Sequence, residues 1–342
     1  MHRQMEPAPS SWSELFESAK LRAKKTGGRK GREKLTSVKR TEVARVKAAS
    51  KYVSEKLERM AFGMPYLNSI HPFYRELLLT IVDEDQYRQC LSRIRSVARI
   101  VRKVAAEAAR RIAASASEEE VRRERGAFFG RLRSLLESLD ECFKLVRGWQ
   151  SEIRKLPSID TGIPSVVIAG APNVGKSSLL KAISRAKPEV KPYPFTTTSV
   201  IVGHLELDGT RVQVIDTPGL LDRPLSEKGP VERRAISALK HLAGVVVYLF
   251  DPTPTCGFTL DYQLAVYKST RELCSGKPLL PVANKVDITT PSQASELIKM
   301  LGYDARDLIF ISALKGICVD YLLAKLKEKI GLLQANSFNT WS

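Results

Sequence analysis

The sequence is poor in several features that build common classes of protein. Its 342 residues include only five cysteines, and no two of them form a C-x-x-C pair, so neither a zinc site nor a disulfide framework is predicted. The longest apolar runs, such as Val245–Phe250, fall far short of the roughly 20 residues that a membrane span needs. The N-terminus lacks the apolar core of a signal peptide. We therefore expect a soluble protein of the reducing cytoplasm that has no membrane partner.

Acidic residues are also few relative to basic ones, and the net charge is +18. Residues 1–160 hold 34 Lys and Arg against 21 Asp and Glu, a net charge of +13, whereas residues 161–342 carry only +5. A solvated surface is the plain explanation, but an excess so concentrated favours a polyanionic partner, above all RNA. An anionic membrane surface is a weaker alternative, since no segment joins this charge to a large apolar face.

The first half of the sequence predicts a basic arm followed by helices. Residues 1–35 are polar and interrupted by glycines, which indicates a flexible basic arm that orders on a partner. Residues 36–157 carry apolar residues at helical spacing and predict an all-α helical bundle domain. The expected helices run over 37–60, from Pro72 to Ile81, from Asp83 to Ile112, and from Ser117 to about Leu156, with Asp83 and Ser117 as the expected caps of the last two. His71, Phe73 and Tyr74 form an alternative contact site, although core packing is favoured by about two to one.

Residues 158–333 alternate between short apolar strands and helices. This order predicts a doubly wound α/β domain whose ligand lies at the carboxyl ends of a mostly parallel sheet. Asp208-Gly209 is a type I′ hairpin signal, so one hairpin strand should run antiparallel. Strands are expected at 165–169, 200–207, 211–215, 245–250, 279–283 and 309–311, and helices at 178–183, 231–242, 259–274, 293–301 and 319–330. Residues 334–342 remain as a short tail.

A phosphate-binding motif follows the first of these strands. The run Gly170-Ala171-Pro172-Asn173-Val174-Gly175-Lys176-Ser177 fits G-x-x-x-x-G-K-[ST], and the next helix begins at Ser178. The glycines let the backbone wrap closely, so that its N–H groups and the helix N-terminus point at phosphates. Lys176 would reach the β- and γ-phosphates, and the Ser177 hydroxyl would ligate Mg²⁺. The sequence therefore predicts a P-loop nucleotide site.

A second motif, Asp216-Thr217-Pro218-Gly219, falls at the end of another strand. Asp216 can hold a Mg²⁺-bound water, and the Gly219 N–H can sense a γ-phosphate, which makes the following segment a switch. Between the first helix and the hairpin lies Tyr193-Pro194-Phe195-Thr196-Thr197-Thr198, where a Mg²⁺-sensing loop belongs. Thr197 is the chosen Mg²⁺ ligand, and Thr196 and Thr198 are alternatives one residue away.

Two further motifs identify the base. In Asn284-Lys285-Val286-Asp287, the Asp287 carboxylate can accept hydrogen bonds from N1 and the exocyclic amine of guanine, whereas adenine offers no such pair of donors. Lys285 would stack along the ring and brace the phosphate loop. Ser312-Ala313-Leu314 would present the Ala313 N–H to guanine O6. Together the motifs predict a P-loop GTPase domain that binds GTP or GDP with Mg²⁺.

These motifs resemble the Obg- and Era-related branch of translation-factor-class GTPases and, more closely, the Nog family of nucleolar GTP-binding proteins. The resemblance spans residues 40–330 and includes the helical part of the chain as well as the nucleotide motifs. The stretches that carry it are Ile70–Tyr74, Ala171–Ser178, Pro192–Thr197, Val202–His204, Asp216–Asp222, Ala235–Leu239 and Cys256-Gly257.

The resemblance implies a factor that binds rRNA of the nascent large ribosomal subunit, helps that subunit to mature, and is a monomer off the ribosome. Because the chain stops soon after the GTPase domain, we expect an archaeal-type short form that acts in the cytoplasm rather than in the nucleolus. Two alternatives stay open. One is a mainly structural rRNA-binding assembly factor with incidental GTP hydrolysis, and the other is a related GTPase that serves the small subunit or tRNA.

Catalysis must proceed without one common side chain. Leu220 stands where small GTPases often carry a Gln that orients the attacking water. In related GTPases an Asn at the place of Asn173 helps to hold K⁺ near the β- and γ-phosphates, so K⁺ is an expected further cofactor. The catalytic roles then fall to Lys176, Thr197, Gly219 and Asn173, and intrinsic turnover should be slow.

Overall fold

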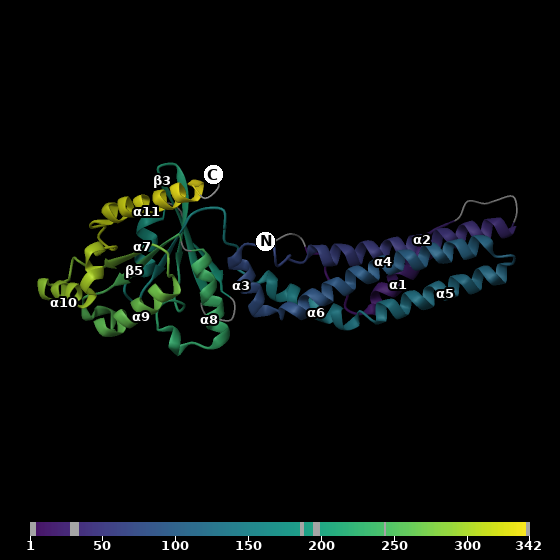
Figure 1. The fold of residues 1–342 in the computed structure, drawn as a ribbon, viewed down its shortest axis with the longest axis horizontal. Helices are drawn as coiled ribbons and strands as arrows, with labels where there is room; N and C mark the ends of the chain where they lie inside the picture. The colour runs from purple at the N-terminus through teal and green to yellow at the C-terminus, as the bar shows by residue number, and fades with distance from the viewer. Residues whose placement is uncertain (1–4, 28–33, 185–187, 194–198, 243, 340–342) are drawn as a thin grey trace. The chain divides into compact units, whose positions relative to one another are not determined.

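The chain folds into two compact units (Figure 1). The computed structural model describes residues 5–27, 34–184, 188–193, 199–242 and 244–339. The first unit combines Met1–Ile70 with Ile81–Arg154 and is helical, and the second combines His71–Thr80 with Lys155–Ser342 and contains the β-sheet. The predicted all-α part and α/β part are therefore both present. No described helix is long and apolar enough to cross a bilayer.

The helical unit is built on two long antiparallel helices, α2 (Lys34–Gly63) and α4 (Glu84–Ala114), which lie side by side (Figure 1). The helices that complete it are α1 (Trp12–Lys25), α5 (Glu118–Glu137) and α6 (Asp140–Arg154). Apolar side chains at the predicted helical spacing, such as Val53, Ile94 and Val101, are buried between them. The predicted cap of α4 is confirmed, since the Asp83 carboxylate accepts the N–H of Gln86 at 2.9 Å.

Part of the stretch predicted to be a flexible arm is helix α1. The Ser11 hydroxyl caps it by accepting the N–H of Glu14. Leu15, Ala19 and Ala23 are buried, and α1 packs against α2 and α5. The prediction of a flexible arm over 1–35 is therefore wrong for residues 12–25. These apolar residues recur every four positions and give the helix a face to bury despite its many charges.

The single helix predicted from Ser117 to Leu156 is two helices, α5 and α6. The first begins behind the predicted cap, where the Ser117 hydroxyl accepts the N–H of Glu120 at 3.2 Å. It ends at Glu137, and the chain turns through Ser138 and the fully buried Leu139 before α6 begins. Neither residue is Gly or Pro, so the sequence contains no breaker at this turn.

Helix α3 (Pro72–Ile81) groups with the α/β unit over residues 71–80, rather than with the bundle predicted for 36–157. Phe73 and Tyr74 are 0% and 6% exposed, which confirms core packing in place of a contact site. The Tyr74 hydroxyl accepts the N–H of Ile159 at 2.8 Å and donates to its carbonyl at 2.7 Å. Helix α3 therefore fixes the segment that leads into the first strand.

The sheet of the α/β unit has the strand order β2-β3-β4-β1-β5-β6-β7. The strands are β1 (Ser165–Ala169), β2 (Glu189–Pro192), β3 (Ser199–Leu207), β4 (Thr210–Asp216), β5 (Val245–Phe250), β6 (Leu279–Ala283) and β7 (Ile309–Phe310). As predicted, β3 alone runs antiparallel to its neighbours, and the other pairs are parallel. Asp208 and Gly209 have φ values of 46° and 77°, as a type I′ turn requires. Strand β2 is absent from the predicted set because its four largely exposed residues form no apolar pattern.

Helices cover both faces of the sheet (Figure 1). They are α7 (Lys176–Ile183), α8 (Pro230–Ser237), α9 (Leu260–Leu273), α10 (Pro291–Leu301) and α11 (Val319–Asn339). The side chains of strand β5 alternate between the two faces of the sheet. Val247 and Leu249 join the apolar core formed with α7 and α11. Tyr248 and Phe250 point the other way, and their rings contact Tyr267 of α9 at centroid distances of 5.1 and 5.3 Å. The predicted doubly wound domain is confirmed.

Candidate nucleotide-binding site

The loop between β1 and α7 requires glycine at two positions. Gly170 has a φ of 144°, and a Cβ there would lie 2.5 Å from the carbonyl oxygen of Leu249. Its N–H donates to the carbonyl of Leu221 at 3.1 Å. Gly175 has a φ of 101° and is the N-cap of α7. The loop thus wraps tightly before the N-terminus of α7, where unpaired N–H groups favour an anion.

Lys176 crosses this loop from the first position of α7. Its ammonium donates to the carbonyls of Gly170 at 2.7 Å and Ala171 at 2.8 Å, and the residue is 7% exposed. Burial lowers the pKa of Lys176, and the charges of Asp216 and Asp222 oppose that effect. A bound phosphate would supply the negative charge that this buried ammonium needs.

Ser177 and Asp216 meet at the carboxyl end of β4. The Ser177 hydroxyl donates to Asp216 Oδ2 at 2.6 Å, whereas the buried Oδ1 has no hydrogen-bond partner among the described residues. Burial raises the pKa of Asp216, and the Ser177 bond and Lys176 oppose the rise. A hydroxyl beside a carboxylate with an unpartnered oxygen fits Mg²⁺, which takes oxygen ligands. Thr197, the third predicted Mg²⁺ ligand, lies outside the described residues.

The rest of the Asp216-Thr217-Pro218-Gly219 motif is held by backbone contacts. The Thr217 hydroxyl donates to the carbonyl of Ile168 at 2.9 Å and so joins the ends of β4 and β1. Gly219 has a φ of 73°, and its carbonyl accepts from the buried Lys228 ammonium at 3.0 Å. Leu220 is 0% exposed. The side chain at the usual position of the catalytic Gln is therefore part of the apolar core.

Asn284 joins the phosphate loop to the segment after β7. Its side-chain amide donates to the carbonyl of Val174 at 2.8 Å, and Oδ1 accepts the N–H of Ala313 at 2.9 Å. Its own N–H donates to Phe250 at 2.8 Å. The predicted bond from Ala313 to guanine O6 would thus require this N–H to exchange partners. Leu314 beside it is 80% exposed.

Lys285 lies elsewhere than predicted. Its ammonium is 2.5 Å from Asp251 Oδ2 and donates to the Thr255 hydroxyl at 2.7 Å, so it braces the loop after β5 rather than the phosphate loop. Asp251 is fully buried, and a buried carboxylate attracts a counter-charge. Sequence reasoning missed Asp251, although it ends a buried strand as Asp216 does. Asp287 is exposed, as a carboxylate awaiting a ligand would be.

Two more side chains bear on the phosphate end. Asn173 has a φ of 63°, and its amide donates to the carbonyl of Cys256 at 3.4 Å. Asp222 directly follows Leu221, whose carbonyl holds Gly170, and its buried Oδ1 has no hydrogen-bond partner in the described part of the chain. The charge of Asp222 also acts on Lys176. Sequence reasoning gave Asp222 no role, and its place three residues after Gly219 was the available signal.

Comparison with known proteins extends over both units. Residues 3–160 match the family described as NOG1 N-terminal helical domain, and residues 165–285 match the family described as 50S ribosome-binding GTPase. Nucleolar GTP-binding protein 1 of Eremothecium gossypii and of Saccharomyces cerevisiae are each 34% identical over 77% of this chain and 41% of their own length. The chain thus spans about two fifths of these relatives. A solved nucleolar GTP-binding protein 1 of Plasmodium falciparum is 31% identical over 54% of this chain and 95% of its own, with a TM-score of 0.47.

The same relatives correct one expectation. Similar proteins from two fungi, Drosophila melanogaster and Dictyostelium discoideum carry names that place them in the nucleolus. These names point to a nucleolar rather than a general cytoplasmic location, so the cytoplasmic prediction is wrong. It rested on the length of sequence after the GTPase domain, which says nothing about the compartment.

Proposed function

The chain belongs to the Nog family of GTP-binding proteins, and from this premise we propose that it binds and hydrolyses GTP and contacts rRNA of the maturing large ribosomal subunit. The proposal that the protein binds GTP is supported by one observation: groups from distant parts of the sequence lie together in the fold. The phosphate loop, the Ser177–Asp216 pair and the Asn284–Ala313 pair come from four chain segments and meet at the carboxyl ends of the strands. In a parallel sheet with helices on both faces, this edge is where ligands bind.

The roles follow from the chemistry of each group. The loop N–H groups and Lys176 bind the phosphates, and Asp287 reads the guanine edge. Ser177 and Asp216, joined by Thr197, would hold Mg²⁺, which neutralises phosphate charge when it is bound. The Gly219 N–H would report the γ-phosphate, so the segment after it is the switch.

Base specificity gives a sharp test of this assignment. Calorimetry should show GTP and GDP binding and no comparable ATP binding. Asp287→Asn should weaken guanine nucleotides and favour xanthine nucleotides, because the amide can donate to the xanthine 2-oxo group and accept from N1–H. The matched control is Asp261→Asn, an exposed carboxylate in the first turn of α9. Equal affinity of the unaltered protein for ATP and GTP would contradict the assignment.

The RNA half of the proposal is supported by charge. The first 160 residues carry a net charge of +13, and each phosphate contact releases counterions, so affinity for RNA should fall steeply with salt. A flat salt profile would count against phosphate contacts. The switch and the structural alternative differ in one outcome: Asp216→Asn should trap a switch on pre-ribosomal particles, whereas a structural factor should leave them normally.

A further inference from the structure

A pocket of about 520 Å³ opens in the helical unit between the end of α2, the turn that follows it and the first half of α4. Its floor is fixed: Met64, Leu67 and Tyr87 are 4%, 3% and 2% exposed. The Tyr87 hydroxyl donates to the carbonyl of Pro65 at 2.7 Å and pins the turn to α4. The pocket is therefore a formed feature with a rigid base, and its volume is in the range of small-ligand sites.

Two aromatic rings at the rim of this pocket face solvent. Phe62 is 65% exposed and Tyr66 is 62% exposed, although burying a ring of either kind would be favourable. Both belong to the pocket lining, so the two exposed rings are displayed together at one opening. Such a pair offers a stacking surface to a flat ligand.

Arginines adjoin the same opening. Arg88 and Arg95 line the pocket from α4. Arg88 is paired with Glu84 at 2.5 Å and donates to Asn68 at 3.1 Å. The Arg95 guanidinium instead lies 5.9 Å from the Phe62 ring centre.

Arg99, one turn further along α4, continues this face and is exposed. Arg95 and Arg99 thus form a short basic track along α4 away from the aromatic opening. Arg102, further along, is paired with Glu58 at 2.5 Å.

Exposed aromatic rings beside a basic track are the combination that binds single-stranded nucleic acid, because bases stack on the rings while the track follows the phosphates. We propose that this pocket takes one unpaired base of an RNA loop, stacked against Phe62 and Tyr66, with Arg95 at the neighbouring phosphate. The proposal rests on the RNA contact proposed above and adds a specific site to it. It predicts a preference for unpaired over duplex RNA.

A second groove of the same unit does not offer this combination. The groove between α1 and α2 is basic, but among its lining residues it has a single aromatic side chain, Tyr52, which is half-buried, whereas the proposed pocket has two exposed rings. Glu55 also lines it and would repel phosphate. That groove can attract RNA by charge without reading a base.

The experiment uses the full chain and a single-stranded oligoribonucleotide of about 12 nucleotides that contains 2-aminopurine. Stacking should quench the 2-aminopurine fluorescence. Phe62→Leu and Tyr66→Leu should each weaken binding by about tenfold and reduce the quenching, while the salt dependence of affinity stays unchanged. Arg95→Gln should instead reduce the slope of log affinity against log salt concentration by about the value of one phosphate contact.

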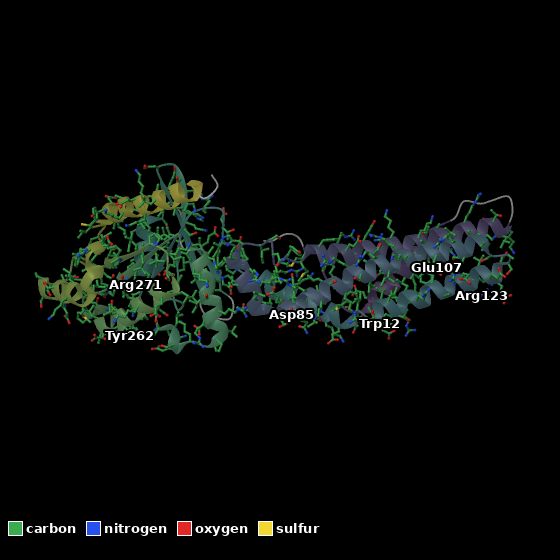
Figure 2. The ribbon with its side chains drawn as sticks, in the orientation of Figure 1. Trp12, Asp85, Glu107, Arg123, Tyr262 and Arg271 are labelled. Carbon is green, nitrogen blue, oxygen red and sulfur yellow. The ribbon has the colours of Figure 1, made fainter. Side chains whose placement is uncertain are left out.

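Two matched controls come from exposed residues elsewhere. Tyr321→Leu removes a ring that is 56% exposed in α11 of the other unit. Arg123→Gln removes a charge that is 74% exposed in α5, at the opposite end of the helical unit from Asp85 of α4 (Figure 2). Neither should change the quenching. Far-UV circular dichroism should match for all variants, since the replaced side chains are exposed or, at Arg95, half-buried.

The outcomes separate the two proposals. If the unaltered protein fails to bind RNA, the proposed RNA function fails and this site fails with it. If the unaltered protein binds RNA but the Phe62 and Tyr66 variants bind and quench as well as it does, the pocket proposal is overturned and the RNA function stands. Equal affinity for duplex RNA of the same length would also overturn the pocket proposal.

Discussion

Gly175 and Asn284 should be energetically coupled, although 109 positions separate them in the sequence. A Cβ at Gly175 would lie 2.2 Å from the Asn284 amide nitrogen, a distance that forces one group to move. The Asn284 side chain is held by Val174 and Ala313, and the backbone N–H of the same residue is held by Phe250. Alanine at 175 therefore displaces a side chain that is held in place.

The size of the coupling follows from these contacts. Asn284→Ala leaves the Val174 carbonyl and the Ala313 N–H buried without partners, at about 1–3 kcal/mol each. Gly175→Ala carries about 1–2 kcal/mol of backbone strain at positive φ, and it also disrupts the same Asn284 bonds. In the double variant that shared loss counts once. Because the shared loss is the two bonds together, about 2–6 kcal/mol, the double variant should be at least about 2 kcal/mol more stable than the sum of the single effects predicts.

Hydrogen exchange of nucleotide-free protein, read on peptides from β1 and β5, measures unfolding of the α/β unit. Tryptophan fluorescence supplies an internal control in a Trp341→Phe background, because the two other tryptophans, Trp12 and Trp149, lie in α1 and α6 of the helical unit. Their unfolding transition should not move in any of the variants. Additive single effects, within about 0.5 kcal/mol, would refute the reasoning, since they would mean that Asn284 yields to the new methyl group without losing its bonds.

Four further predictions concern the phosphate end of the site. Asp222→Asn should lower GTP turnover by about 100-fold and leave GDP affinity unchanged, because the unpartnered oxygen of Asp222 adjoins the phosphate loop. Single-turnover hydrolysis measures this effect, and unchanged turnover would contradict it. Leu220→Gln should not speed hydrolysis but should destabilise the α/β unit by about 1–3 kcal/mol in hydrogen exchange, because the side chain is buried. Burial lowers the pKa of Lys176 below its ordinary 10.5, so the nucleotide-free protein should gain stability as pH rises through the lowered pKa toward 10.5; Lys176→Met should lack this gain in denaturant titrations, and parallel pH profiles would argue against it. Turnover with RNA present should be faster in K⁺ than in Na⁺, and Asn173→Ala should remove the difference; equal rates in the two salts would exclude the K⁺ role.

The fold could be predicted from the sequence where a recognisable motif fixes the order of strand, loop and helix. The patterns correctly predicted the strand before Gly170, the helix after Gly175, and the antiparallel strand β3 that precedes the Asp208-Gly209 turn. Helix α1 was missed because the abundance of charge in residues 1–35 outweighed three apolar side chains at helical spacing, Leu15, Ala19 and Ala23. The break at Ser138 was missed because tertiary packing of Leu139, and no local breaker, ends α5.

The sequence predicts candidate site residues by type but does not predict their contacts. The motif that contains Asn284 and Lys285 marks both as candidate site residues. Their contacts, however, depend on groups that are far away in the sequence. A buried carboxylate at Asp251 draws the Lys285 ammonium away from the phosphate loop. Asn284 takes the Ala313 N–H because its own buried Oδ1 needs a donor. Such competition among buried polar groups cannot be read from spacing.

These partners connect the two ends of the nucleotide site twice. Asn284 links the phosphate loop to Ala313 directly. The second link runs through the segment after β5, where Cys256 accepts from Asn173 of the phosphate loop and Thr255 accepts from Lys285. A base that draws Ala313 to itself must therefore take it from Asn284, which also holds the phosphate loop. One that draws Lys285 takes it from Thr255, whose neighbour Cys256 contacts that loop. Binding of the guanine base should therefore shift the conformational equilibrium of the phosphate loop. A nucleoside without phosphates should already cause this shift.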